Sequence, residues 1–424
     1  MSNDNIGRRG FFQAAAGAAA FTILKPQTVR GMQANSAVRV GLLGCGGRGT
    51  THAETILHDT DARLIAVADM FQDRLDKAKE HIDKLSAAKG HGGVEQTFVG
   101  PKAYQQIIES KMVDAVVIAT PPYFHVEHLA AVVAAGKHAY CEKPVAIDVP
   151  GTRRVLEIGK KAEGKLSLDV GFQIRMAPPY IELMRRIHGG ALGEIASGAI
   201  NYNCPAIDPN FPDLTGALGR LRNWLQDRVL SGDIIVEQNI HVIDICNWAM
   251  QGHPVKAVGH NGRNGRNRPG DTCSSHFNLV FQYPNDVYVS FSSTQFGKGQ
   301  FDANERFYGT KGSSASPYSG PLGVWGDEQW IFGGDKPAAE SGQFSASGAF
   351  SDNLAQADTE KQKAFISSIT SGKFHNQAAA GVESALSAML GRQAAYLGHE
   401  LTWDELLRSN ERLEPGIDLD KLGS

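Results

Sequence analysis

The sequence predicts an α/β protein: a doubly wound parallel sheet followed by an α+β domain with a large, mostly antiparallel open sheet. In the first half, short apolar runs alternate with helical patterns, which is typical of parallel strands joined by helices. Past about Arg175 the runs lengthen and alternate apolar with polar residues, which is typical of half-buried antiparallel strands. A chain of 424 residues is also longer than a single hydrophobic core usually accommodates. We therefore expect domains at residues 37–174 and 175–424, after a leader at residues 1–36.

The strands expected in the first domain are Val38–Leu43, Leu64–Asp69, Thr97–Val99, Ala115–Ala119, His138–Cys141 and Leu166–Gln173. Ligands of such sheets bind at the carboxyl ends of the strands. The segments that follow these ends are a glycine-rich turn, Asp69, Thr120-Pro121-Pro122 and Glu142-Lys143-Pro144. Their shared position at strand ends predicts that they line one site.

The glycine-rich turn, Gly44-Cys45-Gly46-Gly47-Arg48-Gly49, connects the first strand to a helix expected from Thr50 to His58. We assign Gly44 to the tight bend, Gly46 to the close approach of a pyrophosphate, and Gly49 to close packing of the helix on the strand. The free N–H groups at the helix start would face the phosphates. This pattern predicts a Rossmann-type dinucleotide site.

Asp69 ends the second strand, twenty residues past Gly49, where a carboxylate would accept hydrogen bonds from the adenosine ribose. Its charge would repel a 2′-phosphate, so we expect NAD as the cofactor in preference to NADP. Arg48 and Arg74 could each soften this preference by reaching a phosphate, or could lie solvated at the surface.

Lys143 follows a strand and precedes a proline, so its ammonium group can point into the cleft instead of lying along a helix. There it could hydrogen-bond a reacting hydroxyl and stabilise a developing alkoxide. An ion pair with Glu142 or a solvated loop position is the alternative.

A helix is expected from Gly232 to Asp244, entered near Ser231. On one continuous helix Glu237 and His241 would share a face, with Asp244 on the same side. A histidine flanked by carboxylates is suited to general base catalysis, although many helical histidines lie in caps or at the surface.

Further elements of the second domain are expected as strands at Phe277–Tyr283 and Val287–Thr294 and as helices at about 359–369 and 381–396 that close the domain. Residues Gly309–Asp352 are rich in Gly, Ser and Pro, which indicates long surface loops or an inserted arm.

The composition excludes several classes of protein. A net charge of −3 with dispersed basic residues does not indicate a basic surface for binding nucleic acid. The five cysteines lie far apart without a C-x-x-C pair, and no H-E-x-x-H is present, so we expect neither a metal site nor a disulfide framework.

The leader contains Arg8-Arg9 before a small-residue apolar run, Ala14–Leu24, and resembles a twin-arginine export signal. A disordered cytoplasmic tail is the alternative. Export through the twin-arginine machinery would place the folded protein in the periplasm, where no free nicotinamide pool exists. We therefore expect a tightly bound cofactor that is returned to its starting redox state or reoxidised by a second substrate.

The chain after the leader resembles the glucose-fructose oxidoreductase, inositol dehydrogenase and rhizopine-catabolism (Gfo/Idh/MocA) oxidoreductases. The motifs that carry this resemblance are Gly44–Gly49, Asp69, Ala119–Pro122 with His125, Gly136-Lys137-His138 through Glu142-Lys143-Pro144, Gly171–Arg175, Leu192–Ile195 and Gly309–Gly312. The resemblance implies cofactor contacts from Thr120, Pro121, His125, Glu142 and Lys143.

The resemblance also implies that Lys143 and His241 act on the substrate hydroxyl, with His241 as acid/base. An assisting aspartate of the family is replaced here by Glu237, which shifts the carboxylate by one methylene. We expect the substrate cleft to include Gln173, Arg175, Tyr202, Asn203 and Trp224.

Three functions are compatible with these residues. The first is an exported oxidoreductase that moves a hydride between the nicotinamide and a carbon of a sugar or polyol. The second is an NAD-dependent glycoside hydrolase or lyase that works by transient oxidation, elimination and re-reduction. The third is a cofactor-bound sugar-binding protein without turnover. An exposed face on the second sheet would favour a homo-oligomer.

Overall fold

The computed structural model describes residues 37–333, 344–345, 348–349 and 352–422, and residues 38–424 form one compact unit. The expected leader, residues 1–36, lies outside the described residues. Of the helices that are described, none is both long and apolar enough to pass through a lipid bilayer.

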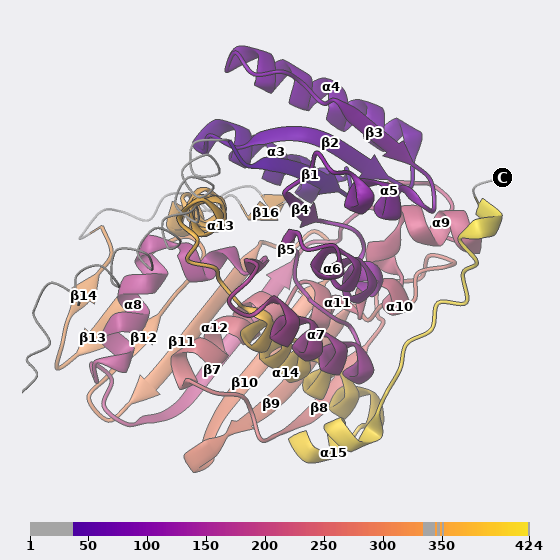
Figure 1. The fold of residues 1–424 in the computed structure, drawn as a ribbon. Coiled ribbons are helices and arrows are strands. Elements are labelled where there is room, and N and C mark those ends of the chain that lie inside the picture. Colours follow the sequence, from indigo (N-terminus) through magenta and orange to yellow (C-terminus); the bar gives the residue numbers. More distant parts are fainter. Residues whose placement is uncertain (1–36, 334–343, 346–347, 350–351, 423–424) are drawn as a thin grey trace, which may run out of the picture. The chain divides into compact units, whose positions relative to one another are not determined.

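The first sheet has six parallel strands in the order β3-β2-β1-β4-β5-β6 (Figure 1). The strands are β1 (Arg39–Leu43), β2 (Arg63–Asp69), β3 (Gln96–Val99), β4 (Ala115–Ile118), β5 (His138–Cys141) and β6 (Leu168–Val170). The strand order reverses between β1 and β4, which makes a crevice at their carboxyl ends. The predicted doubly wound parallel sheet is therefore confirmed. Its last strand is shorter than expected because a 3-10 helix begins at Gln173.

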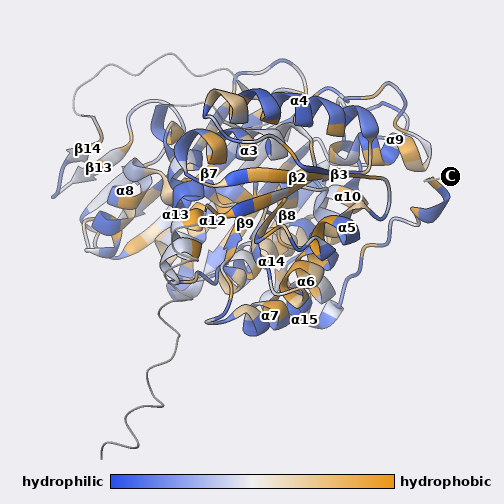
Figure 2. Ribbon diagram, turned by 45° about the horizontal axis from the view of Figure 1, so that its top comes forward, coloured by the Kyte–Doolittle hydropathy of each residue, from blue (hydrophilic) through white to orange (hydrophobic). Residues whose placement is uncertain are grey.

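Five helices connect these strands: α3 (Gly47–Asp59), α4 (Gln72–Ala88), α5 (Ala103–Glu109), α6 (His125–Ala134) and α7 (Val149–Ala162). Helix α4 is amphipathic and buries Leu75, Ala78 and Ile82. Figure 2 accordingly shows the hydrophobic colour along β2 and the hydrophilic colour along much of α4. Helix α7 begins where the Asp148 side chain accepts a hydrogen bond from the Gly151 N–H.

The second sheet has nine strands in the order β14-β13-β12-β11-β7-β10-β9-β8-β17, and all neighbours are antiparallel except β7 and β10. Its strands are β7 (Ile195–Cys204), β8 (Lys256–Gly262), β9 (His276–Tyr283), β10 (Val287–Gln295), β11 (Asp302–Gly309), β12 (Gly312–Ala315), β13 (Gly323–Gly326), β14 (Trp330–Ile331) and β17 (Leu401–Thr402). A separate hairpin pairs β15 (Phe344–Ser345) with β16 (Gly348–Ala349). The predicted mostly antiparallel second sheet is confirmed.

The remaining helices are α8 (Pro178–His188), α9 (Gly216–Arg222), α10 (Arg228–Ser231), α11 (Ile234–Glu237), α12 (Ile240–Met250), α13 (Ala357–Ser371), α14 (Ala378–Leu397) and α15 (Trp403–Ser409). Helices α12 and α14 pack on one face of the second sheet (Figure 1). The other face carries exposed apolar side chains at Val258, Val280 and Tyr288.

Residues 312–331 lie within the segment expected as long surface loops or an inserted arm, but they contain β12, β13 and β14, which extend the second sheet beyond β11. The strands are short, and β12 is built only of Gly, Ser and Ala, so its own sequence carries little strand propensity. Backbone pairing with the neighbouring strands forms β12 instead.

The prediction of one continuous helix from Gly232 to Asp244 is wrong, because the segment is broken into α11 and α12 at Gln238 and Asn239. Nearly every side chain between Ile234 and Ile245 is buried, so the apolar pattern has no single face from which a break could be read. Glu237 and His241 consequently lie on two different helices.

Helix α13 also differs from the expectation that it closes the second domain. It packs against α3, and Phe365 and Ile366 join the apolar cluster under the first sheet. The domain boundary at residue 174/175 stays a prediction, since the chain returns to the first sheet late in the sequence.

Candidate functional site

A cleft of about 1310 Å³ opens at the carboxyl ends of β1, β2, β4 and β5 and continues to the second sheet. The expected site residues that line it are Gly44, Gly46, Gly47, Arg48, Asp69, Thr120, Pro121, His125, Glu142, Lys143, Gln173, Tyr202, Trp224, Glu237 and His241. The fold thus gathers side chains from both sheets around one space.

The glycine-rich turn shapes one wall of the cleft. Gly44 has φ +98°, and a Cβ there would lie 2.5 Å from the Ala119 carbonyl oxygen. A Cβ on Gly49 would lie 1.9 Å from the Gly44 carbonyl oxygen, so helix α3 can approach the end of strand β1 only because residue 49 is glycine. At Gly46 a Cβ would meet no atom within 4 Å, which leaves space over the helix start.

Asp69 holds the ends of β1 and β2 together. One carboxylate oxygen accepts from the Cys45 N–H at 2.7 Å and the other from the Phe71 N–H at 2.8 Å. Burial raises the pKa of Asp69, and the two backbone N–H groups oppose this effect. Because each carboxylate oxygen can accept a second hydrogen bond, the group can still bind a ribose hydroxyl.

Arg48 does not point freely at a phosphate. Its Nε donates to Glu142 Oε1 at 2.8 Å, while Nη1 and Nη2 donate to the two Asp358 oxygens at 3.0 and 2.6 Å. Its side chain is 20% exposed. The structure therefore places Arg48 in a charge cluster beneath the cleft, whereas Arg74 lies at the cleft wall with its guanidinium over Phe71.

Glu142 is the buried centre of this charge cluster. It accepts from His52 Nε2 at 2.7 Å, while the other oxygen accepts from the Lys143 N–H at 2.9 Å. Burial alone would raise its pKa, but Arg48, His52 and Lys143 hold the pKa of Glu142 well below its usual range. The carboxylate fixes the backbone that carries Lys143.

Lys143 reaches across the cleft to helix α11. Its Nζ donates to Glu237 Oε1 at 2.9 Å and to the Glu237 carbonyl oxygen at 2.5 Å, and both side chains are 12% exposed. The ion-pair partner is thus Glu237, not Glu142 as the alternative supposed. The ammonium group is held inside the cleft, between the turn after β5 and helix α11.

His241 lines the cleft beside this ion pair and is 9% exposed. Neither ring nitrogen has a hydrogen-bond partner among the described residues, and Nδ1 is fully buried. Burial and the Lys143 charge hold the pKa of His241 well below its usual value, so the imidazole is neutral near pH 7. A neutral, unpartnered imidazole in a cleft can accept a proton from a ligand.

Two expected substrate residues lie elsewhere. Arg175 is paired bidentately with Asp244, at 2.8 and 2.9 Å, and does not line the cleft. Asn203 follows Tyr202 on β7, and successive strand residues face opposite sides of a sheet. Tyr202 faces the cleft, so Asn203 faces away and its Oδ1 accepts from Thr294 instead.

Two expected cofactor residues have structural contacts. The His125 ring nitrogens lie 2.7 Å from the Pro144 and Thr120 carbonyl oxygens, so the ring ties together the turns after β4 and β5. The Thr120 hydroxyl lies 3.0 Å from His128 Nδ1.

Several cleft or support residues carry no local sequence signal. Asp358 meets Arg48 across more than three hundred positions. Gln238 and Tyr318 line the cleft, as do Ile417–Asp420 near the end of the chain. Only the tertiary fold brings these residues to the cleft.

The residues present fit a dinucleotide. No side chain caps α3, so its first N–H groups remain available beside the open space at Gly46. Asp69 supplies the acceptor expected for a ribose. No group of three or more His, Cys, Asp or Glu side chains in the described part of the chain could hold a metal ion.

Comparisons with known proteins agree with this geometry. A family described as an oxidoreductase family with an NAD-binding Rossmann fold (Gfo/Idh/MocA) matches residues 38–170, and its C-terminal domain matches residues 180–315. Together the two matches cover more than half of the chain.

Among curated relatives, a myo-inositol 2-dehydrogenase of Thermotoga maritima is 30% identical over 221 residues, covering 52% of this chain and 57% of that protein. An inositol 2-dehydrogenase of Rhizobium meliloti is 26% identical over 298 residues, covering 68% and 78%. A glycosyl hydrolase family 109 protein of Shewanella baltica is 27% identical over 218 residues, covering 47% and 46%. The chain thus matches about half of the length of two of these relatives.

Solved structures share the fold. A myo-inositol 2-dehydrogenase from Lactobacillus plantarum aligns with a TM-score of 0.68 at 20% identity, covering 87% of this chain and 99% of that one. A levoglucosan dehydrogenase in complex with NADH and levoglucosan aligns with a TM-score of 0.67 at 19% identity, covering 87% and 99%. The chain described here belongs to the Gfo/Idh/MocA oxidoreductase family, with an NAD-binding Rossmann domain.

Proposed function

We propose that this protein is an NAD-dependent oxidoreductase that acts on a hydroxyl-bearing carbon of a sugar or polyol. The observation that carries the proposal is the meeting of Lys143 and Glu237 beside the unpartnered His241, in a cleft that continues to the glycine-rich turn. When bound, NAD would supply the carbon that accepts a hydride. Relatives named as inositol dehydrogenases support the substrate class.

The protein residues would then handle the proton. His241 is neutral and would take the proton of the reacting hydroxyl. The Lys143 ammonium would stabilise the negative charge that develops on that oxygen. Glu237 accepts from the Lys143 ammonium and keeps it directed into the cleft.

The test incubates purified protein with NAD and a panel of inositols, aldoses and anhydrosugars, and follows the absorbance of reduced nicotinamide. Lys143→Met and His241→Asn are expected to lose turnover while retaining bound dinucleotide. Lys137→Met is the matched control, because Lys137 donates to the Ser110 and Val113 carbonyls and does not line the cleft. Unchanged turnover in Lys143→Met would contradict the proposal.

A redox-neutral glycoside hydrolase or lyase is the second candidate, favoured by the similarity to a glycosyl hydrolase family 109 protein. The same residues would serve it. Nitrophenyl glycosides separate the two candidates, because a glycosidase would release nitrophenol without accumulating reduced nicotinamide. A protein that binds sugar but does neither would be a binding protein.

Export and tight cofactor retention are also part of the proposal. The Arg8-Arg9 pair before the apolar run Ala14–Leu24 supports a twin-arginine signal. Replacing both arginines by lysine should keep the protein in the cytoplasmic fraction, and unchanged export would contradict the assignment. Denaturing the purified protein should release NAD at about one equivalent per chain.

We further propose a homo-oligomer formed through the open face of the second sheet. Tyr288 and Val280 are 48% and 39% exposed on this face. A Tyr288→Lys/Val280→Lys variant should sediment as a smaller species than the wild type, and equal sedimentation would contradict this interface.

A further inference from the structure

The connection between α11 and α12 carries one more polar group into the cleft. Gln238 directly follows Glu237 and, together with Asn239, separates it from the helix that bears His241. Gln238 is 7% exposed and lines the cleft. Its Oε1 accepts from Gln295 Nε2 at 2.5 Å and lies 3.4 Å from the Cys204 thiol. Its Nε2 has no hydrogen-bond partner among the described residues and is not fully buried.

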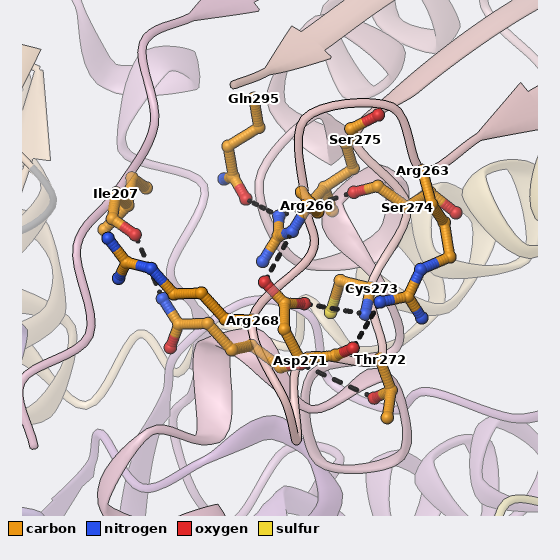
Figure 3. Close-up of polar contacts among 12 residues, drawn as sticks. Ile207, Arg263, Arg266, Arg268, Asp271, Thr272, Cys273, Ser274, Ser275 and Gln295 are labelled. Atoms are coloured by element: carbon orange, nitrogen blue, oxygen red, sulfur yellow. Dashed lines mark hydrogen bonds and ion pairs between the residues drawn. The ribbon is translucent and has the colours of Figure 1, made fainter. Parts of the chain in front are cut away.

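The direction of this amide is set by a chain of hydrogen bonds that begins at an arginine. Arg266 lies in the loop between β8 and β9 and is 9% exposed. Its Nη1 donates to Gln295 Oε1 at 2.7 Å, as Figure 3 shows. A guanidinium can only donate, so Gln295 must turn its oxygen toward Arg266 and its nitrogen toward Gln238. Gln238 must then offer its oxygen to Gln295, which leaves its nitrogen for the cleft.

The arginine itself is firmly placed. Its Nε donates to Asp271 at 2.8 Å, and the two side chains are 7% and 6% exposed (Figure 3). Ser274 of the same loop donates through its N–H and its hydroxyl to Asp233, which caps the start of α11. The loop therefore supports both ends of α11, on which Glu237 lies.

We propose that Gln238 is a specificity residue whose amide N–H donates to a substrate oxygen next to the reacting hydroxyl, and that Arg266 is a positioning residue acting through Gln295. This inference rests on the proposed oxidoreductase function and deepens it. A donor at this place recognises an oxygen with a free lone pair, such as a neighbouring hydroxyl, a ring ether or a carbonyl of a polyol or sugar. If the Gln238 amide were turned the other way, its oxygen would face the cleft and would require a hydrogen-bond donor, such as a hydroxyl group, from the substrate.

The test measures steady-state turnover with myo-inositol, glucose and levoglucosan in the presence of an added electron acceptor, because a retained NAD is reduced only once unless it is reoxidised. Gln238→Met should raise KM about three- to tenfold with little change in kcat, because one neutral hydrogen bond to the bound substrate is lost. Arg266→Met should raise KM in the same way, since both amides are then free to turn. Arg266→Lys should restore much of the wild-type KM, because an ammonium also donates to Gln295.

A double-mutant cycle separates positioning from general damage. In a Gln238→Met background, Arg266→Met should cause no further rise in KM, although it lowers stability in both backgrounds. Asp271→Asn is the matched control: it removes the charge pair of Arg266 but leaves the bond to Gln295, so it should lower stability and leave KM near the wild-type value.

The outcomes are distinct. A wild type that reduces NAD with one of these probes, while Gln238→Met keeps the wild-type KM, overturns the role of Gln238 and leaves the oxidoreductase function intact. Additive effects of Gln238→Met and Arg266→Met overturn the relay. A wild type that reduces no NAD with any probe overturns the proposed function and this assignment with it.

Discussion

Replacing Arg48 by methionine should destabilise the protein strongly, because the guanidinium neutralises two carboxylates that lie mostly out of water. Glu142 and Asp358 have side chains 6% and 30% exposed, and Arg48 makes three hydrogen bonds to them, at 2.8, 3.0 and 2.6 Å. Removing one partner of a buried ion pair costs about 3–5 kcal/mol. The methionine fills most of the volume, so the loss arises from the charges left behind.

The protein contains a matched control. Arg39 also binds a carboxylate through two nitrogens, Nε at 3.0 Å and Nη2 at 2.7 Å from Asp114, but the two side chains are 41% and 39% exposed. Exposed ion pairs contribute about 0–1 kcal/mol. Arg39→Met should therefore change the free energy of unfolding far less than Arg48→Met does.

Urea unfolding followed by circular dichroism measures both variants, and titration with NAD measures affinity. Equal losses in the two variants would refute the charge-cluster argument. A large loss of NAD affinity in Arg48→Met with unchanged stability would instead support the phosphate contact that the sequence allowed.

Three further predictions concern the cleft and its support. The kcat/KM of the enzyme should fall on the acid side with an apparent pKa below about 6.5, because the lowered pKa of His241 keeps its imidazole neutral until the pH drops through that pKa. An acidic limb of the kcat/KM profile with its midpoint above about pH 7 would contradict this. Gly46→Ala should unfold like the wild type but bind NAD more weakly, since its Cβ meets no protein atom. Gly49→Ala should lower the thermal midpoint, because its Cβ would lie 1.9 Å from a carbonyl oxygen. A lower thermal midpoint for Gly46→Ala than for Gly49→Ala would be inconsistent with these contacts. Asp169→Asn should cost about 3–5 kcal/mol in urea unfolding, because it leaves the buried Lys361 ammonium, 2.9 Å away, without its carboxylate. Since the pKa of Asp169 is lowered, the wild type should also lose this contribution as the pH falls, and a stability independent of pH on the acid side would count against it.

Local patterns were sufficient for most of the first sheet because its central strands β1, β2 and β4 are short, mostly buried apolar runs, each followed by a distinct turn. The glycine turn is a clear example, since a positive φ at Gly44 and the contact of Gly49 with the Gly44 carbonyl both require the absence of a side chain. The break between α11 and α12 was not predictable in this way, because buried residues surround it on all sides.

The strand β7 shows why neighbouring candidates can differ in outcome. The sequence made Tyr202 and Asn203 equally suitable for the cleft, but consecutive strand residues point to opposite faces. The structure turns Tyr202 inward. A register choice that depends on the whole sheet decides which of the two can meet a substrate.

From its residues alone, the chain specifies the order of its elements, the dinucleotide turn and the chemical types that can serve a hydroxyl substrate, because turn geometry and apolar periodicity act over a few positions. Which groups meet is a different matter: Lys143 pairs with Glu237, Arg48 with Asp358, and Arg266 directs Gln238 through Gln295. These contacts join residues far apart in sequence, so no local pattern specifies them. Each forms because leaving a buried charge or amide unpaired is costly, and the folded chain brings one suitable partner within reach.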